Sequence, residues 1–370
     1  MVIKKPGMRG MSAARLHEFS AIEAARAIRN SVITSEELVR ASLARIRERE
    51  PIVEAWAHLD PALALAEARA RDAELKARGP VGPLHGVPVG IKDIIDTAAL
   101  PTENGTPIFE GRRPAHDATV VANLRAAGAV ILGKTVTCEL AGIAPREPMH
   151  PLDPTRTPGG SSSGSGAAVA DRMVPVAFGT QTGGSVLRPA AFCGVVGYKP
   201  TYNTINRAGM KFAAEGVDTI GLIARTVEDM ALVTDACIDR PPVQLSGLKK
   251  PPRIGLCRTY LWDAKASPET KAAVESTAKR LKAAGASVTE FELTDEFTRL
   301  TGIREVVNNY ERACGLAWEW AHHREKLSPQ MTRTVEEGLA APHATYVEAT
   351  RLSERCRGRL DQLMGKLDVL

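Results

Sequence analysis

The sequence predicts an α/β fold, in which strands and helices alternate along the chain. Two segments carry this prediction. The first is the helical stretch TVVANLRAAG followed by the strand AVILGK; the second is the strand RIGLC, the helix SPETKAAVESTAKRLKAAG and the strand SVTEFEL. Such alternation is typical of a sheet with helices packed on its faces. With 370 residues the chain can bury a large core, as one large domain or two smaller ones.

The first part of the chain, residues 1–78, is expected to be a helical scaffold. From about Ser12 to Arg78 the apolar residues recur at helical spacing. The segment from Thr34 to Glu37 places a capping residue before acidic ones, which is typical of a helix start. The alanine-rich stretch LDPALALAEARARDAELKAR favours a helix throughout.

The composition changes at Gly79 to short β-prone runs broken by glycine and proline. Strands and helices then alternate to about Asp239, so residues 79–240 are expected to form the core of the fold. Residues 241–370 form a C-terminal α/β part. It opens with a surface linker from Pro241 to Pro252, bracketed by proline pairs, and ends in helix before LDVL, which resembles the start of a strand.

Composition excludes several classes of protein. The chain is 44% hydrophobic and 25% charged, with a formal net charge of +5. Basic and acidic residues alternate, so we expect neither a nucleic-acid nor a membrane partner. No signal-type apolar region follows the basic N-terminus, and no 18 apolar residues are consecutive. The six cysteines form no CxxC pair, which favours free thiols in a reducing cytoplasm.

Two serines in glycine-rich turns, Ser161 and Ser185, lie 24 positions apart within residues 158–200. Cleavage of an amide, a poor electrophile, needs an activated nucleophile and a site for the oxyanion. The Gly-Gly pair before Ser185 permits a tight turn that directs successive N–H groups into one concavity. The expected oxyanion hole therefore comprises Thr182, Gly183, Gly184 and Ser185.

The base for this chemistry is expected to be Lys92, since these motifs contain no histidine. Lys92 stands in the apolar run VPVGIKDII, which predicts a buried strand end. Burial disfavours the charged ammonium and lowers the pKa of a lysine, so that a neutral Lys92 could accept a proton near pH 7. The alternative is that these motifs have no catalytic role. Lys92 would then be a strand-end lysine that reaches water, and the Gly/Ser-rich loops would be flexible linkers. Asp93 and Thr180 are expected to orient the loops, and the sequence assigns neither a role in the reaction.

These motifs together resemble the amidase signature family, whose members hydrolyse amides with a Ser–cis-Ser–Lys triad. The matches are GVPVGIKD around Lys92, GGSSSGS around Ser161 and GTQTGGS, which ends at Ser185. They are dense from Pro83 to Leu232. Among family members, the motifs are most similar to those of malonamidase-type enzymes. The resemblance implies one amidase domain over residues 1–370, a central mixed twisted sheet covered on both faces by helices, and no cofactor or metal. It also implies a cis peptide bond before Ser161. Ser161 itself would relay a proton from the nucleophile Ser185 to Lys92. Family members usually continue past LDVL, so the C-terminal part is expected to be truncated.

The predicted activity is hydrolysis of a small amide through a seryl acyl-enzyme. Many family members have a basic residue two positions after the nucleophile, but here Leu187 takes that place and Arg188 follows. Arg188 could bind a substrate carboxylate bidentately, or it could be a structural arginine paired with a carboxylate. The alternatives are the glutamine-hydrolysing subunit of a tRNA-dependent amidotransferase and a non-catalytic relative. A homodimer is possible, because the apolar helical face from Ile303 to Trp320 fits either core or interface.

Three further motifs are assigned structural roles. The stretch GAVILGKT, from Gly128 to Thr135, fits a P-loop pattern, but AVIL predicts a buried strand. His322 and His323 with Glu325 have no third ligand at a suitable spacing, so a solvated helix face is expected. Cys193 in AAFCGVVG is expected to pack as a small apolar residue.

Overall fold

The computed structural model describes residues 13–144, 148–238, 247–248 and 250–370. The chain divides into two compact units: residues 1–244 with 315–334, and residues 245–314 with 335–370. Of the predicted linker from Pro241 to Pro252, residues 241–246 and 249 lie outside the described part. Among the described residues, no helix has the length and apolar character needed to cross a membrane.

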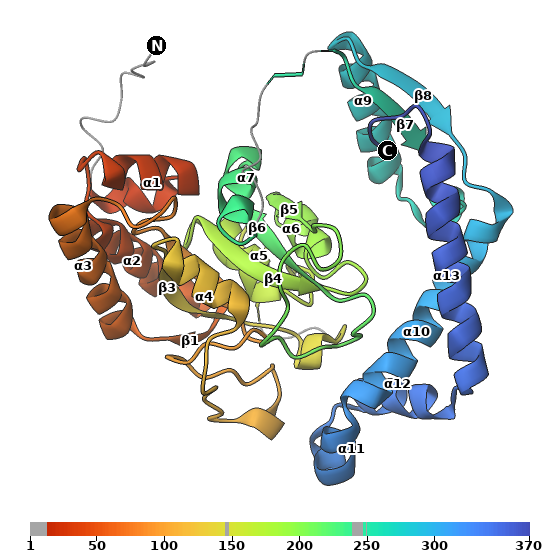
Figure 1. Cartoon of the computed structure of the whole chain (residues 1–370), viewed down its shortest axis with the longest axis horizontal. Coiled ribbons are helices and arrows are strands. Elements are labelled where there is room, and N and C mark those ends of the chain that lie inside the picture. Colours follow the sequence, from red (N-terminus) through yellow and green to blue (C-terminus); the bar gives the residue numbers. More distant parts are fainter. Residues whose placement is uncertain (1–12, 145–147, 239–246, 249) are drawn as a thin grey trace. The chain divides into compact units, whose positions relative to one another are not determined.

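The first unit is built on one sheet whose strands, within the described residues, are β1 (Trp56–Leu59), β2 (Pro88–Lys92), β3 (Val130–Thr135), β4 (Val176–Gln181), β5 (Val196–Tyr198) and β6 (Thr219–Ala224). Their order across the sheet is β1-β3-β2-β4-β6-β5. Figure 1 shows this sheet and labels β1, β3, β4, β5 and β6. Strand β2 pairs in parallel with β3 and β4, whereas the β1–β3, β4–β6 and β5–β6 pairs are antiparallel. The mixed sheet predicted from the sequence is confirmed.

Helices cover both faces of this sheet, as predicted. Successive strand residues point to opposite faces, so that Phe178 and Ala177 of β4 belong to different apolar clusters. The Phe178 cluster includes α1, α4 and α7, and the Ala177 cluster includes α3, α5 and α6, while α2 contributes to both. These helices are α1 (Ala21–Arg29), α2 (Ser35–Val53), α3 (Pro61–Arg78), α4 (Thr119–Ala126), α5 (Ser163–Ala170), α6 (Leu187–Phe192) and α7 (Val227–Asp235).

Helix α2 begins where the sequence predicted a helix start. Thr34 caps α2: its side chain accepts a hydrogen bond from the Glu37 amide, and the Glu37 carboxylate accepts one from the Thr34 amide. One expectation for residues 1–78 was incomplete, because the edge strand β1 lies between α2 and α3. Its sequence, WAHL, lacks the strict alternation of apolar and polar residues that predicts a strand.

The second unit contains the predicted strand–helix–strand segment. Strands β7 (Arg253–Cys257) and β8 (Ser287–Phe291) are parallel, with α8 (Trp262–Lys265) and α9 (Pro268–Ala283) between them in the chain. Val369 forms a parallel bridge with Ile254, which agrees with the strand character of LDVL.

Further helices complete the C-terminal part: α10 (Leu300–Gly315), α11 (Ala317–His323), α12 (Pro329–Ala340) and α13 (His343–Met364). Ile303 of α10 packs against the cluster formed by Phe297, Leu352 and Cys356. At Ile303, the apolar helical face that fitted either core or dimer interface is therefore part of the core.

Candidate active site

Lys92 is the last residue of β2, and its side chain is completely buried. Its Nζ donates to Ser161 Oγ at 2.9 Å and to Thr180 Oγ1 at 2.8 Å. Strand β2 lies between β3 and β4 in the sheet, so the amine at its end is enclosed by neighbouring strands and their loops. The structure thus brings Lys92 and Ser161 into direct contact.

Ser161 follows a cis peptide bond from Gly160, the bond that the resemblance implies. Its carbonyl accepts a hydrogen bond from the Cys138 amide at 3.1 Å. The serines that follow attach this segment to β4: Ser162 Oγ donates to the Thr180 carbonyl at 3.3 Å, and Ser165 Oγ donates to the Phe178 carbonyl at 2.9 Å. These serines therefore fix the backbone that presents Ser161 to Lys92.

Ser185 lies in the loop between β4 and α6, and its carbonyl accepts a hydrogen bond from the Ser162 amide at 3.2 Å. This bond joins the two serine-bearing segments. Gly184 has a φ of +145°, a conformation open to glycine but rarely to other residues. Within the described residues, no backbone N–H from Thr182 to Ser185 donates to another protein group. These four N–H groups are therefore not used by other protein groups in the part of the chain that the structure describes.

The two serine hydroxyls are not joined directly: within the described part of the chain, no hydrogen bond connects Ser185 Oγ with Ser161 Oγ. The Ser185 residue is buried, with 8% of its surface exposed. Catalytic hydrogen bonds are often long in free enzymes and shorten when substrate binds. Proton transfer from Ser185 would require this shortening.

Arg188, in the first turn of α6, lies against both serine segments. Its Nη1 donates to the Gly160 carbonyl at 3.1 Å, and its backbone N–H donates to the Gly184 carbonyl at 2.8 Å. No carboxylate among the described residues forms an ion pair with it. A guanidinium has five N–H donors, so Arg188 retains donors for a ligand.

The contact of Lys92 with Thr180 is a feature that sequence reasoning did not assign. Thr180 lies near the end of β4, and β4 pairs in parallel with β2 through Ile91 and Phe178. Only this strand register brings the Thr180 hydroxyl to the lysine. No local pattern in GTQTGGS carries that information.

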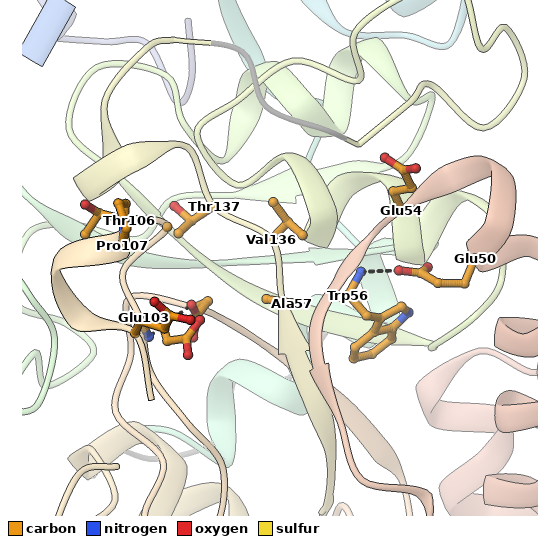
Figure 2. Close-up of a pocket in the computed structure, with 12 residues that line it drawn as sticks. Glu50, Glu54, Trp56, Ala57, Glu103, Thr106, Pro107, Val136 and Thr137 are labelled. Atoms are coloured by element: carbon orange, nitrogen blue, oxygen red, sulfur yellow. Dashed lines mark hydrogen bonds between the residues drawn. The ribbon is translucent and has the colours of Figure 1, made fainter. Parts of the chain in front are cut away.

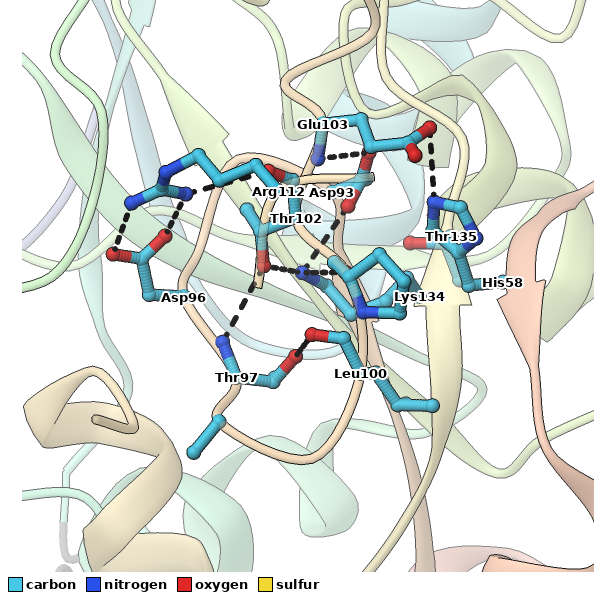
Figure 3. Close-up of polar contacts among 12 residues, drawn as sticks. His58, Asp93, Asp96, Thr97, Leu100, Thr102, Glu103, Arg112, Lys134 and Thr135 are labelled. Atoms are coloured by element: carbon cyan, nitrogen blue, oxygen red, sulfur yellow. Dashed lines mark hydrogen bonds and ion pairs between the residues drawn. The ribbon is translucent and has the colours of Figure 1, made fainter. Parts of the chain in front are cut away.

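Asp93, the neighbour of Lys92, belongs to a separate polar network (Figure 3). Asp93 Oδ1 lies 3.1 Å from the Nζ of Lys134, and Asp93 Oδ2 accepts a hydrogen bond from the Glu103 amide at 3.1 Å. Burial raises the pKa of Asp93 and lowers the pKa of Lys134 to about 8. Lys134 also donates to the Thr102 hydroxyl, so the pair attaches the loop after β2 to β3.

An acidic pocket of about 700 Å³ adjoins this network. Figure 2 shows Glu50 and Glu54 at one side and Glu103 and Thr106 at the other, all among its lining residues. Glu50 accepts hydrogen bonds from the Ala55 and Trp56 amides, and burial raises its pKa to about 7. Lys92, Ser161 and Ser185 do not line this pocket, so it is distinct from the serine cluster.

The three motifs assigned structural roles pack against neighbouring parts of the chain. Strand β3 includes Lys134 and Thr135 of the P-loop-like stretch, and all its residues are buried, which confirms the predicted strand. Cys193 is buried, its Sγ donates to the Pro158 carbonyl, and burial raises its pKa to about 12. The rings of His322 and His323 pack against Trp318.

Comparison with known proteins identifies the family. The model of the family Amidase matches residues 37–370. This chain belongs to the amidase family. A solved structure described as the crystal structure of an amidase has 30% identity and a TM-score of 0.87, covering 95% of this chain and 81% of its own. The native peptide amidase from Stenotrophomonas maltophilia has 31% identity and a TM-score of 0.78, covering 90% and 78%. The predicted family and fold are therefore confirmed.

Curated relatives of this chain carry a more specific name. A glutamyl-tRNA(Gln) amidotransferase subunit from Chloroflexus aurantiacus is 40% identical over 298 residues, which make up 75% of this chain and 61% of the relative. The chain thus spans less than two thirds of that relative's length. This relationship favours the alternative of an amidotransferase component over the expected small-amide hydrolase. The likeness to malonamidase-type enzymes stays a prediction.

Proposed function

We propose that this amidase hydrolyses the side-chain amide of glutamine through an acyl-enzyme on Ser185. The observation that carries the proposal is the buried contact between Lys92 Nζ and Ser161 Oγ, in a segment hydrogen-bonded to the Ser185 backbone. Glutamine is preferred over other amides because of the 40% identity to the amidotransferase relative. The cytoplasm is the compartment expected for this activity.

In the proposed acylation, Ser185 Oγ attacks the amide carbon while its proton passes to Ser161, whose own proton passes to the neutral amine of Lys92. The N–H groups from Thr182 to Ser185 stabilise the oxyanion, and one such donor typically contributes about 3 kcal/mol. Collapse of the tetrahedral intermediate breaks the C–N bond, and the relay returns the proton to the departing ammonia. Water then attacks the ester by the same relay and releases glutamate.

Arg188 is the proposed partner of a substrate carboxylate. Its guanidinium uses one N–H for the Gly160 carbonyl and lies beside Gly184 of the oxyanion loop. A carboxylate bound there would be held bidentately by the planar guanidinium. Glutamine provides such a carboxylate, but so does the monoamide of a dicarboxylic acid. Arg188 therefore also fits a second candidate function, hydrolysis of a small acidic amide without transfer of ammonia.

Ammonia release tests these proposals on wild type, Ser185→Ala and a control, Ser353→Ala, placed in α13. The substrates are glutamine, succinamic acid and the neutral propionamide. We expect Ser185→Ala to lose release from every amide, whereas Ser353→Ala retains it. Preference for glutamine would support the first candidate, and preference for succinamic acid the second. Preference for propionamide would refute the role of Arg188.

Partner dependence separates transfer from simple hydrolysis. An amidotransferase component should release ammonia from glutamine faster when its partner subunits and ATP are present. An independent hydrolase should show the same rate with and without them. A folded wild type that releases no ammonia under either condition would support the non-catalytic alternative.

A further inference from the structure

Gln181 precedes the proposed nucleophile in the chain, and its side chain binds the backbone that follows the nucleophile. Gln181 is the last residue of β4, with 7% of its surface exposed. Its Oε1 accepts hydrogen bonds from the Val186 amide at 2.9 Å and from the Leu187 amide at 3.0 Å. One carbonyl oxygen thus satisfies two consecutive N–H groups that follow Ser185.

These two N–H groups open α6, whose N-cap position is occupied by Val186. The first N–H groups of a helix have no partner within it, and a capping serine, threonine, aspartate or asparagine usually binds one. Valine has no side-chain acceptor. Here the acceptor comes from Gln181, on the other side of the loop, so the connection spans every residue from Thr182 to Ser185.

The loop is held at other points through its carbonyl and side-chain groups. The Gly184 carbonyl accepts from the Arg188 amide, and the Ser185 carbonyl accepts from the Ser162 amide. The Thr182 hydroxyl donates to Asp218. These bonds do not use the loop amides, and Gln181 fixes the segment immediately after the nucleophile.

We propose that Gln181 is a positioning residue that holds Ser185 and the oxyanion amides in their reactive arrangement. The inference rests on the proposed role of Ser185 as nucleophile. Gln181 acts through the loop and does not contact the reacting atoms. A displacement of about 1 Å in a reacting group can reduce a rate by about 10²-fold, so a small movement of this loop would be measurable.

Two substitutions separate the acceptor oxygen from side-chain volume. Gln181→Met has a similar length and no acceptor oxygen, whereas Gln181→Glu keeps an acceptor in the same place. The matched control is Thr226→Val, which removes another helix-starting contact, the hydrogen bond from the Asp229 amide to the Thr226 hydroxyl that opens α7. Should Gln181→Met fail to fold, Gln181→Asn replaces it, because its shorter side chain cannot reach both amides.

The decisive measurement is the second-order rate at which a fluorophosphonate labels Ser185. Ser185 Oγ forms a bond to phosphorus, fluoride leaves, and the serine proton passes to the Ser161–Lys92 relay. This readout does not depend on which amide is the substrate. The thermal midpoint of each variant, and kcat and KM for the amide that wild type hydrolyses, complete the comparison.

We expect labelling and kcat of Gln181→Met to fall about 10²-fold at unchanged KM, with Gln181→Glu close to wild type. Thr226→Val should lower the thermal midpoint and leave labelling unchanged. Labelling of Gln181→Met at the wild-type rate would overturn the inference, as would a loss that only follows the fraction of unfolded protein. A folded wild type that is not labelled at Ser185 would instead refute the proposed nucleophile as well.

Discussion

At the scale of single residues, the proposed chemistry depends on a completely buried amine. Lys92 Nζ contacts the hydroxyls of Ser161 and Thr180, each within hydrogen-bonding distance. A buried lysine is costly unless its polar group is bonded, and an apolar side chain of similar length would avoid that cost. The amine at this position is therefore better explained by function than by stability.

Replacement of Lys92 by methionine tests this explanation. Lys92→Met keeps the side-chain length and removes the base, so kcat for the amide should fall by about 10²- to 10⁴-fold. The thermal midpoint should remain near that of wild type, because no charge or amine is left to bury. Steady-state kinetics with circular dichroism melting measures both quantities. Activity within threefold of wild type would exclude Lys92 as the base.

Glu50 predicts a pH dependence of stability. Burial raises its pKa in the folded protein to about 7 from the ordinary value of 4.5, so the folded state binds its proton more tightly than the unfolded state. The resulting stabilisation is fully present below pH 4.5 and is lost as the pH rises towards 7. Glu50→Gln, which does not titrate, should show a flatter dependence across this range. Urea unfolding of both proteins at several pH values compares the slopes, and equal slopes would contradict the assignment.

At the scale of elements, the buried Asp93–Lys134 pair fastens β2 and its following loop to β3. Removal of one partner from a buried ion pair leaves an uncompensated charge and costs about 3–5 kcal/mol. We therefore expect Lys134→Met to lower the free energy of unfolding by that amount. Asp93→Asn keeps the acceptor for the Glu103 amide and removes the charge.

The double variant Lys134→Met/Asp93→Asn should recover part of the loss, because no unpaired charge remains. A double-mutant cycle from urea unfolding measures this coupling. Strictly additive effects would show that the two side chains do not depend on each other. The same cycle in kcat would reveal whether the network also supports Lys92, the neighbour of Asp93 in the chain.

At the scale of the whole molecule, the cysteines report on packing in both units. In the part of the chain that the structure describes, none of the six cysteines forms a disulfide; Cys314 is exposed, Cys257 is intermediate, and the other four are buried. Burial raises the pKa of Cys193 to about 12 and also raises that of Cys237. Since the thiolate is the reactive form, these buried thiols should react slowly in the folded protein.

We expect Ellman's reagent to modify one thiol rapidly in the native protein and all six after denaturation. The fast phase should disappear in Cys314→Ser, and the unfolding midpoint should be the same with and without a reducing agent. Absorbance of the released thionitrobenzoate follows the reaction. Rapid modification of any of the four buried cysteines in the native state would contradict the packing described around them.

The sequence by itself determined the features that depend on neighbours in the chain. A threonine before two glutamates started α2, and the apolar run AVIL identified β3 as a buried strand rather than a phosphate loop. The motifs around Lys92, Ser161 and Ser185 were sufficient to recognise the family. Caps, apolar runs and glycine turns act within a few residues, which is why local patterns reveal them.

The tertiary structure alone decided which of these residues meet. Ser161 and Thr180 are 69 and 88 positions from Lys92. Thr180 reaches it because β4 pairs with β2 in one particular register, and Ser161 because the serines that follow it are hydrogen-bonded to β4. Register is a property of two strands together, and no single segment encodes it. The role proposed for Gln181 has the same origin, because its acceptor bonds form only once the loop after β4 turns back into α6.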